Sequence, residues 1–129
     1  MRGLPVKPLS TPSAAAVLLE RVINGEGAML RSLALNGPTA ATLTLSVQDK
    51  HRGYDWIDIS FEMSGINDAR LVDDKRLDFI DTDDGITVVF ENGQWGLAVG
   101  RYGGLEALKS APFYFIGTSL KYEEAPFSG

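Results

Sequence analysis

Apolar and polar residues alternate along most of the chain after residue 28, and this period of two predicts half-buried β-strands. Between residues 39 and 48, Ala41, Leu43, Leu45 and Val47 alternate with polar or small residues. Residues 86–91 and 94–99 are two apolar runs joined by Asn92-Gly93, the strongest short signal for a β-hairpin. Further strands are expected at residues 29–35, 56–63, 69–72, 77–80 and 113–122.

The N-terminal part of the chain carries the one long helical pattern. Thr11-Pro12 is a typical helix start, with an N-cap followed by proline at the first helical position. We expect a helix from Pro12 to about Asn24, ended by Asn24-Gly25. Its apolar stripe is predicted at Ala14, Ala15, Val17, Leu18 and Val22. A single helical turn is expected at residues 105–110.

This order of elements predicts a mainly β fold (α+β). Neighbouring strands without intervening helices form antiparallel pairs, because a parallel sheet needs long crossover connections. The expected architecture is a curved sheet or a two-sheet sandwich of seven to eight strands with one N-terminal helix. Residues 11–123 are interpreted as a single domain, residues 1–10 as an extended, proline-containing arm and residues 124–129 as a tail.

Composition excludes several kinds of chemistry. The 129 residues include no cysteine and one histidine, so thiol nucleophiles, disulfides, zinc–thiolate sites and multi-histidine sites are excluded within one chain. No apolar stretch approaches the roughly 18 residues of a membrane span. The run Ala14–Leu19 is too short for the core of an export signal. We therefore expect a cytoplasmic protein with no cofactor and no metal.

Negative charge is concentrated in the second part of the chain. Residues 1–52 have six Lys or Arg against three Asp or Glu, whereas residues 53–129 have six against fourteen. Nucleic acids and anionic membranes bind through basic surfaces, which an acidic chain with a net charge of −5 does not offer. The expected partner is a basic protein, with no nucleic acid and no membrane.

Four local motifs suggest catalytic or ligand-binding chemistry but do not meet its requirements. Residues 81–85 (DTDDG) do not have the ligand spacing of a calcium loop. Residues 100–104 (GRYGG) lack phosphate-loop spacing. Asp58 and Glu62 share a strand face but lie roughly 13 Å apart, too far for a glycosidase carboxylate pair. His51 lies between Lys50 and Arg52 on a polar loop, a setting that suits neither a catalytic base nor a metal ligand.

Trp56 is the most informative single residue. It shares the polar face of its strand with Asp58, Ser60 and Glu62, and an aromatic residue among polar ones is typical of an interaction surface. Trp95, in contrast, aligns with Leu97 and Val99 and is expected in the core.

The segment from Trp56 to Ile66, an alternating strand that leads through Phe61 to Gly65-Ile66, resembles small bacterial β-rich domains. These domains include immunity proteins of polymorphic toxin systems. The resemblance covers residues 28–123 in outline and implies a non-catalytic, partner-binding domain; it assigns no functional residue.

We expect the chain to be a small binding protein that covers a basic partner with an acidic face. The residues expected at that face are Trp56, Asp58, Glu62, Asp73, Asp74, Asp81, Asp83 and Asp84. The alternative is a small-ligand or enzymatic site in an aromatic-lined pocket, with Tyr54, Arg101, Tyr102, Tyr114 and Tyr122. A third alternative is a self-associating structural subunit.

Residues 113–116 (FYFI) are apolar on both strand faces, and this pattern indicates burial on both sides. Either two layers of the same chain or a second copy can cover such a strand. We predict a homodimer that uses this last strand, the N-terminal arm or both.

Overall fold

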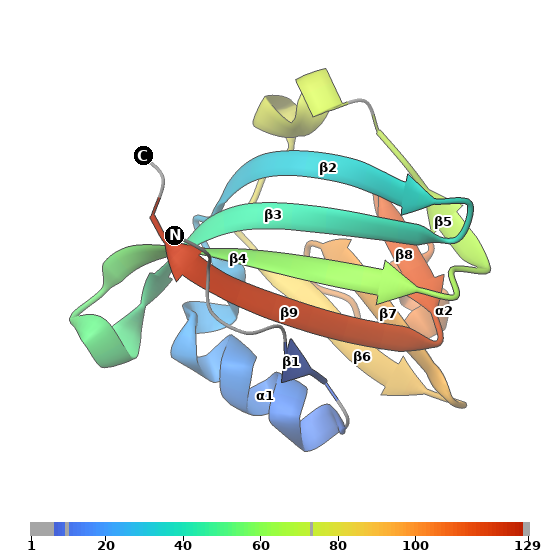
Figure 1. The fold of residues 1–129 in the computed structure, drawn as a ribbon, viewed down its shortest axis with the longest axis horizontal. Helices are drawn as coiled ribbons and strands as arrows, with labels where there is room; N and C mark the ends of the chain where they lie inside the picture. The colour runs from blue at the N-terminus through green and yellow to red at the C-terminus, as the bar shows by residue number, and fades with distance from the viewer. Residues whose placement is uncertain (1–6, 10, 73, 128–129) are drawn as a thin grey trace.

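The computed structural model describes residues 7–9, 11–72 and 74–127, and its described strands form two antiparallel sheets. Sheet A has the order β1-β9-β4-β3-β2, and sheet B the order β5-β8-β7-β6 (Figure 1). The strands of sheet A are β1 (Lys7–Pro8), β2 (Met29–Gly37), β3 (Ala40–Asp49), β4 (Asp55–Ser64) and β9 (Ser119–Pro126). Those of sheet B are β5 (Asp68–Arg70), β6 (Ile86–Glu91), β7 (Gln94–Val99) and β8 (Tyr114–Gly117). The predicted mainly β sandwich with an N-terminal helix is confirmed.

The core lies between the two sheets. The inward residues of β3, from Ala41 to Val47, are at most 1% exposed, and those of β4 from Ile57 to Met63 are at most 4% exposed. The other side of the same hydrophobic cluster comes from β7 and from the chain at the start of β8, through Trp95, Leu97, Phe113 and Phe115. Trp95 is 3% exposed, as the sequence pattern predicts.

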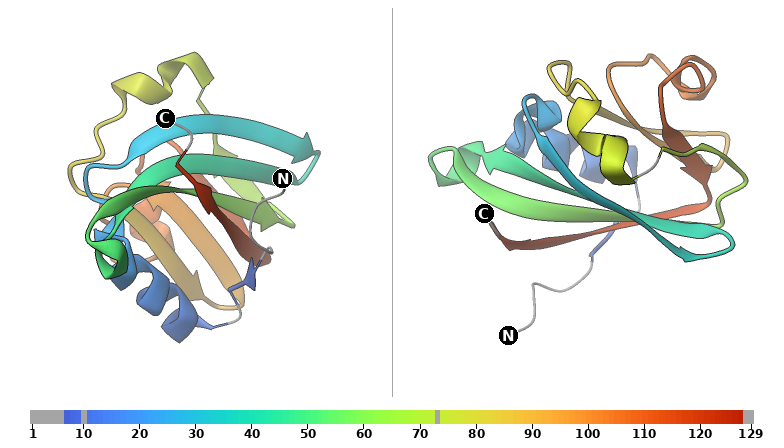
Figure 2. Two further views of the ribbon diagram at one scale, coloured as in Figure 1. Left: turned by 60° about the vertical axis from the view of Figure 1, so that its left-hand side comes forward. Right: turned by 90° about the horizontal axis from the view of Figure 1, so that it is seen from above.

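Helix α1 (Pro12–Arg21) closes one side of the sandwich, next to β6 (Figures 1 and 2). Thr11 caps it as expected, because its Oγ1 accepts a hydrogen bond from the Ala14 backbone N–H at 3.1 Å. The buried face is Ala15, Leu18 and Val22, whereas Ala14 and Val17 point outward, so the predicted stripe is only partly correct. A 3₁₀ turn, η1 (Ile23–Gly25), follows the helix.

The opposite side is covered by η3 (Asp74–Phe79), a 3₁₀ segment that contacts β2 and lies above it in Figure 1. We expected a strand at residues 77–80. This prediction is wrong, because Leu77 turns into the core and the following Phe79 turns out to solvent, without a partner strand.

The C-terminal part of the chain also differs from the prediction. The expected strand 113–122 is split at Thr118 into β8 and β9, which belong to different sheets. The expected tail begins too early, since β9 continues to Pro126 and pairs Ile57 with Pro126. Of the expected arm, Lys7 and Pro8 pair with β9 and Leu9 is buried, while residues 1–6 and 10 lie outside the described residues.

The apolar run at residues 113–116 is covered within the chain. Phe113 and Phe115 belong to the core between the sheets, while Tyr114 and Ile116 pack with Leu108 of the short helix α2 (Leu105–Leu108) on the outer side. The strand is therefore buried on both sides, as expected, by two layers of one molecule.

Candidate functional site

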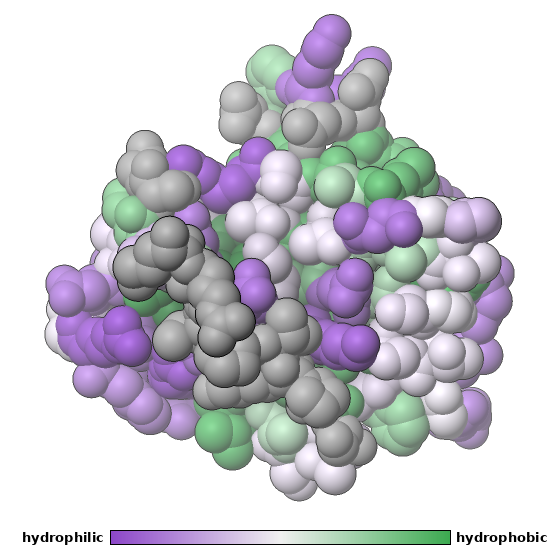
Figure 3. All heavy atoms as spheres, in the orientation of Figure 1, coloured by the Kyte–Doolittle hydropathy of each residue, from purple (hydrophilic) through white to green (hydrophobic). Residues whose placement is uncertain are grey.

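Residues 73–84 carry most of the net charge, and η3 within this segment projects from the sandwich. It contains six Asp and two basic residues, a net charge of −4 in a chain whose net charge is −5. In the orientation of Figure 1, η3 is the projection above β2, and hydrophilic and hydrophobic side chains lie next to each other there (Figure 3). We call residues 73–84 the acidic segment.

Phe79 is the most exposed large apolar side chain among the described residues, at 86%. Leu71, just before the acidic segment, is 46% exposed. Leu77, two residues before Phe79, is 3% exposed and anchors η3 in the core. The same short segment therefore buries one large apolar side chain and exposes the other. A rigidly anchored, exposed aromatic side chain flanked by charges is the arrangement that interface hot spots use.

The turn after η3 is held by hydrogen bonds of Thr82 and Asp81. Thr82 Oγ1 donates to the Ala28 carbonyl at 2.7 Å, and Asp81 Oδ1 accepts from the Asp83 backbone N–H at 2.8 Å. Asp81, Asp83 and Asp84 are all exposed, and within the described part of the chain no Lys or Arg forms an ion pair with them. Their negative field is therefore directed at solvent.

An open groove of about 520 Å³ runs between β2 and η3 at the foot of this segment. Its walls are Ala28, Met29, Leu30, Arg31, Leu77, Ile80 and Thr82. The groove thus joins the acidic segment to the edge of sheet A.

Trp56 lies beyond the groove on the outer face of sheet A and is half-buried. Its ring packs against Phe127, with 5.9 Å between the ring centroids, and the guanidinium of Arg31 lies 5.8 Å from the Phe127 centroid. Arg31 also lines the groove. A continuous surface therefore leads from Trp56 through Phe127 and Arg31 to the acidic segment.

The other residues of the predicted acidic face have different surroundings. Asp58, expected to be solvated, is 7% exposed and accepts a 2.6 Å hydrogen bond from Ser46 Oγ. Glu62 is half-buried on the same outer face of sheet A, between its strand partners Thr42 and Lys121. Asp73 lies outside the described residues, and Asp74 is the first residue of η3.

The residues of the alternative, aromatic-lined pocket are spread over the molecule. Tyr114 lies on sheet B and donates to Asp68 at 2.9 Å, while Tyr122 on sheet A packs against the core. Tyr54 is exposed at the β3–β4 turn. Arg101 pairs with Glu26 at 2.9 Å, and Tyr102 packs against Gly100. Burial raises the pKa of Tyr114, helped by the adjacent Asp68 carboxylate.

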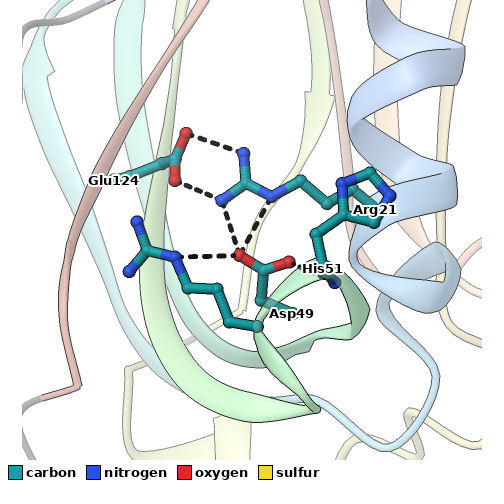
Figure 4. A network of polar contacts seen from close by, with 5 residues as sticks. Arg21, Asp49, His51 and Glu124 are labelled. Carbon is teal, nitrogen blue, oxygen red and sulfur yellow. Dashed lines mark hydrogen bonds and ion pairs between the residues drawn. The ribbon is translucent and has the colours of Figure 1, made fainter.

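A charge network that the sequence pattern did not reveal joins the end of α1 to β3 and β9 (Figure 4). Arg21 at the end of α1 donates to Asp49 at 3.0 Å through Nε and to Glu124 at 3.1 Å through Nη1. The Asp49 and Glu124 side chains are only 1% and 6% exposed. These partners are 28 and 103 residues from Arg21, so no local spacing could have revealed them.

The network favours the charged forms of Asp49 and Arg21. Burial alone would raise the pKa of Asp49, but the hydrogen bonds from Arg21 and from the His51 backbone, with the charges of Arg21 and Arg52, hold that pKa below its usual value. The hydrogen bond to Glu124, and then that to Asp49, raise the pKa of Arg21 further. Arg21 pairs with both Asp49 and Glu124, and both carboxylates are buried. We therefore interpret this network as one that stabilises the fold.

The described residues contain no group of three or more His, Cys, Asp or Glu side chains arranged to hold a metal ion. Within the same residues, no helix has the length and apolarity needed to cross a membrane. No protein-family model, curated protein or solved structure matches the chain.

Proposed function

We propose that this chain is a small, non-catalytic binding protein that docks a basic partner protein onto the acidic segment. The observation that carries the proposal is Phe79, an 86% exposed aromatic side chain on an anchored turn within twelve residues of net charge −4. Aromatic anchors supply binding energy at interfaces, and a field of one sign speeds association with partners of the other sign.

The resemblance of residues 56–66 to β-rich immunity-like domains supports an inhibitory form of this function. In that form the acidic segment covers a basic surface of the partner, such as the cleft in which a nuclease holds its substrate. The surface from Trp56 through Arg31 would then meet the outer part of the same partner.

The test begins with capture of partners from native lysate at low and at high salt, followed by affinity measurement with the purified partner. The first variant is Phe79→Ala, with Val17→Ala as its control, because Val17 is also exposed (68%) but lies on α1. We expect at least a tenfold loss of affinity for Phe79→Ala and no change for the control.

The second variant neutralises Asp81, Asp83 and Asp84 together by substitution with Asn. Its control is Asp55→Asn with Glu106→Gln and Glu123→Gln, which removes the same charge elsewhere on the molecule. The first triple variant should lose affinity at low salt and differ less from the wild type at high salt. Equal loss in both triple variants, or no loss in either, would refute docking at the acidic segment.

A further inference from the structure

The β3–β4 hairpin extends beyond its neighbouring strands. The β3–β4 ladder continues to the pair Asp49–Asp55, whereas β2 begins opposite Ser46 and β9 ends opposite Ile57. The end of this hairpin is the loop that projects at the left of Figure 1. It therefore presents residues 50–54 (KHRGY), which we call the hairpin tip, away from the body of the sandwich.

The tip has an unusual backbone. Lys50–Arg52 form a 3₁₀ turn, and Gly53 and Tyr54 follow with φ of 65° and 67°. For a bulky residue such as tyrosine, this left-handed conformation is a genuine outlier. It is fixed by a 2.9 Å hydrogen bond from the Tyr54 N–H to the Asp49 carbonyl, and by one from Gln48 Nε2 to the Tyr54 carbonyl at 3.3 Å.

The other non-glycine residues with positive φ differ from Tyr54 in type or exposure. Ile23 is also an outlier, but it is half-buried in η1, and the following Asn24 is of a type that tolerates this conformation. Asn92 precedes Gly93 in a tight hairpin turn, where asparagine is a preferred residue. Tyr54 instead has a side chain that is 53% exposed, so the strained backbone directs an aromatic ring toward solvent. Strain of this kind is concentrated at functional sites.

Contacts with Asp49 and with α1 also hold the tip in place. Asp49 accepts from the His51 backbone N–H at 3.0 Å and pairs with Arg52 Nε at 3.5 Å. Lys50 forms an ion pair with Glu20 of α1. The charge network with Arg21 fixes Asp49 itself (Figure 4). A loop ordered before binding avoids much of the entropy cost of association.

We propose that the hairpin tip is a preformed binding loop that inserts Tyr54 into an acidic pocket of a partner protein. The chemistry of the tip defines this partner. Residues 50–54 contain no Asp or Glu. The exposed neighbours of Tyr54 along the chain are His51, Arg52, whose side chain is 59% exposed, and one carboxylate, that of Asp55. A complementary pocket must offer carboxylates at its mouth and apolar walls for the ring.

This contact is additional to the proposed docking at the acidic segment. The two surfaces attract opposite charges, and they project from different sides of the molecule in Figure 1. Variants of one surface therefore leave the other intact, and the two proposals can fail separately.

The test places a benzophenone amino acid at position 54 of the full chain and crosslinks it in the cells that make the protein. The control is a second variant of this chain that carries the same probe in place of Glu106, whose side chain is 93% exposed. The partner crosslinked only from position 54 is then purified, and its affinity is measured for the wild type, Tyr54→Asn, Arg52→Gln and the triple Asn variant at 81, 83 and 84.

We expect Tyr54→Asn, which keeps the backbone conformation, to weaken binding at least tenfold. Arg52→Gln should weaken it in a salt-dependent way, while the triple Asn variant should bind as the wild type does. Three outcomes would overturn the proposal: no protein crosslinked specifically from position 54, crosslinking to nucleic acid, or a purified partner whose affinity Tyr54→Asn does not change.

Discussion

At the scale of single residues, Arg21 joins three elements of the fold through Asp49 and Glu124. It pairs with two carboxylates that the fold has taken almost completely out of water. A buried ion pair adds little net stability compared with apolar residues of the same shape, but removal of one partner leaves a charge buried without compensation. Arg21 has two such partners, so its loss is more costly than that of a surface cation.

The first prediction therefore concerns Arg21→Met. We expect the free energy of unfolding, measured by urea denaturation at neutral pH, to fall by about 3–5 kcal/mol. Lys50→Met is the control, because it breaks the Lys50–Glu20 ion pair on the exposed side of α1, and we expect no resolvable change. If both substitutions lowered the free energy of unfolding equally, Arg21 would contribute no more to stability than a surface cation.

The second prediction is the pH dependence of that difference. In the wild type, the lowered pKa of Asp49 adds stability above the carboxyl's unfolded pKa of about 3.9, and this stability is lost as the pH falls through the folded pKa. In Arg21→Met, Asp49 stays buried but loses the hydrogen bond and charge of Arg21, so its pKa is raised. Protonation of Asp49 at low pH then removes the uncompensated buried charge and reduces the loss of stability. The gap in stability between the two proteins should shrink from pH 7 to pH 3 in paired denaturation curves, and a constant gap would contradict this account.

The third prediction concerns the strain at Tyr54. Asparagine adopts the left-handed conformation more readily than tyrosine, so Tyr54→Asn should raise the free energy of unfolding by about 0.5–1 kcal/mol. Tyr54→Phe keeps the ring and the strain and should leave stability unchanged. Thermal unfolding of both variants measures this change. If Tyr54→Asn were less stable than the wild type, the tyrosine ring would contribute packing that stabilises the fold.

At the scale of elements, local patterns predict the strands whose two faces differ. β3 and β4 follow from alternation, because a strand with one buried face must repeat every second residue. The β6–β7 hairpin follows from Asn92-Gly93 between two apolar runs. The 3₁₀ segment η3 could not be predicted, because Leu77 and Phe79 fit an alternating strand and only the missing partner strand excludes it. Likewise, Glu123 and Glu124 suggest a polar tail, but Arg21 compensates Glu124 and lets β9 continue.

The fourth prediction tests how η1 meets the turn before β6. Gly85 and Gly27 have similar φ angles of 78° and 74°. A Cβ at Gly85 would lie 2.1 Å from the Asn24 carbonyl oxygen, whereas one at Gly27 would meet nothing within 4 Å. We expect Gly27→Ala to cost only the left-handed penalty of about 1–2 kcal/mol and Gly85→Ala clearly more, by urea denaturation. If both substitutions lowered the free energy of unfolding equally, η1 would be able to move away from a side chain at position 85 without loss of stability.

At the scale of the whole molecule, the two sheets share one core although none of the described strands pairs across them. The chain covers the apolar run at residues 113–116 from both sides, so this run no longer supports the predicted homodimer, which stays a prediction. The candidate site also becomes visible only at this scale. The sequence shows the acidic segment, but the exposure of Phe79 and the contact of Trp56 with Phe127 depend on where distant elements pack.

The fifth prediction follows from the shared core. Each sheet contains one tryptophan: Trp56 lies in sheet A and Trp95 in sheet B. In Trp95→Phe the fluorescence reports sheet A, and in Trp56→Phe it reports sheet B. Residues of both sheets pack in the same cluster, so neither sheet can expose its inner face without exposing that of the other. Within each variant, fluorescence and far-ultraviolet circular dichroism should therefore give one coincident urea transition. Separate transitions would show that the sandwich is two folding units, and the single-domain interpretation of residues 11–123 would have to be abandoned.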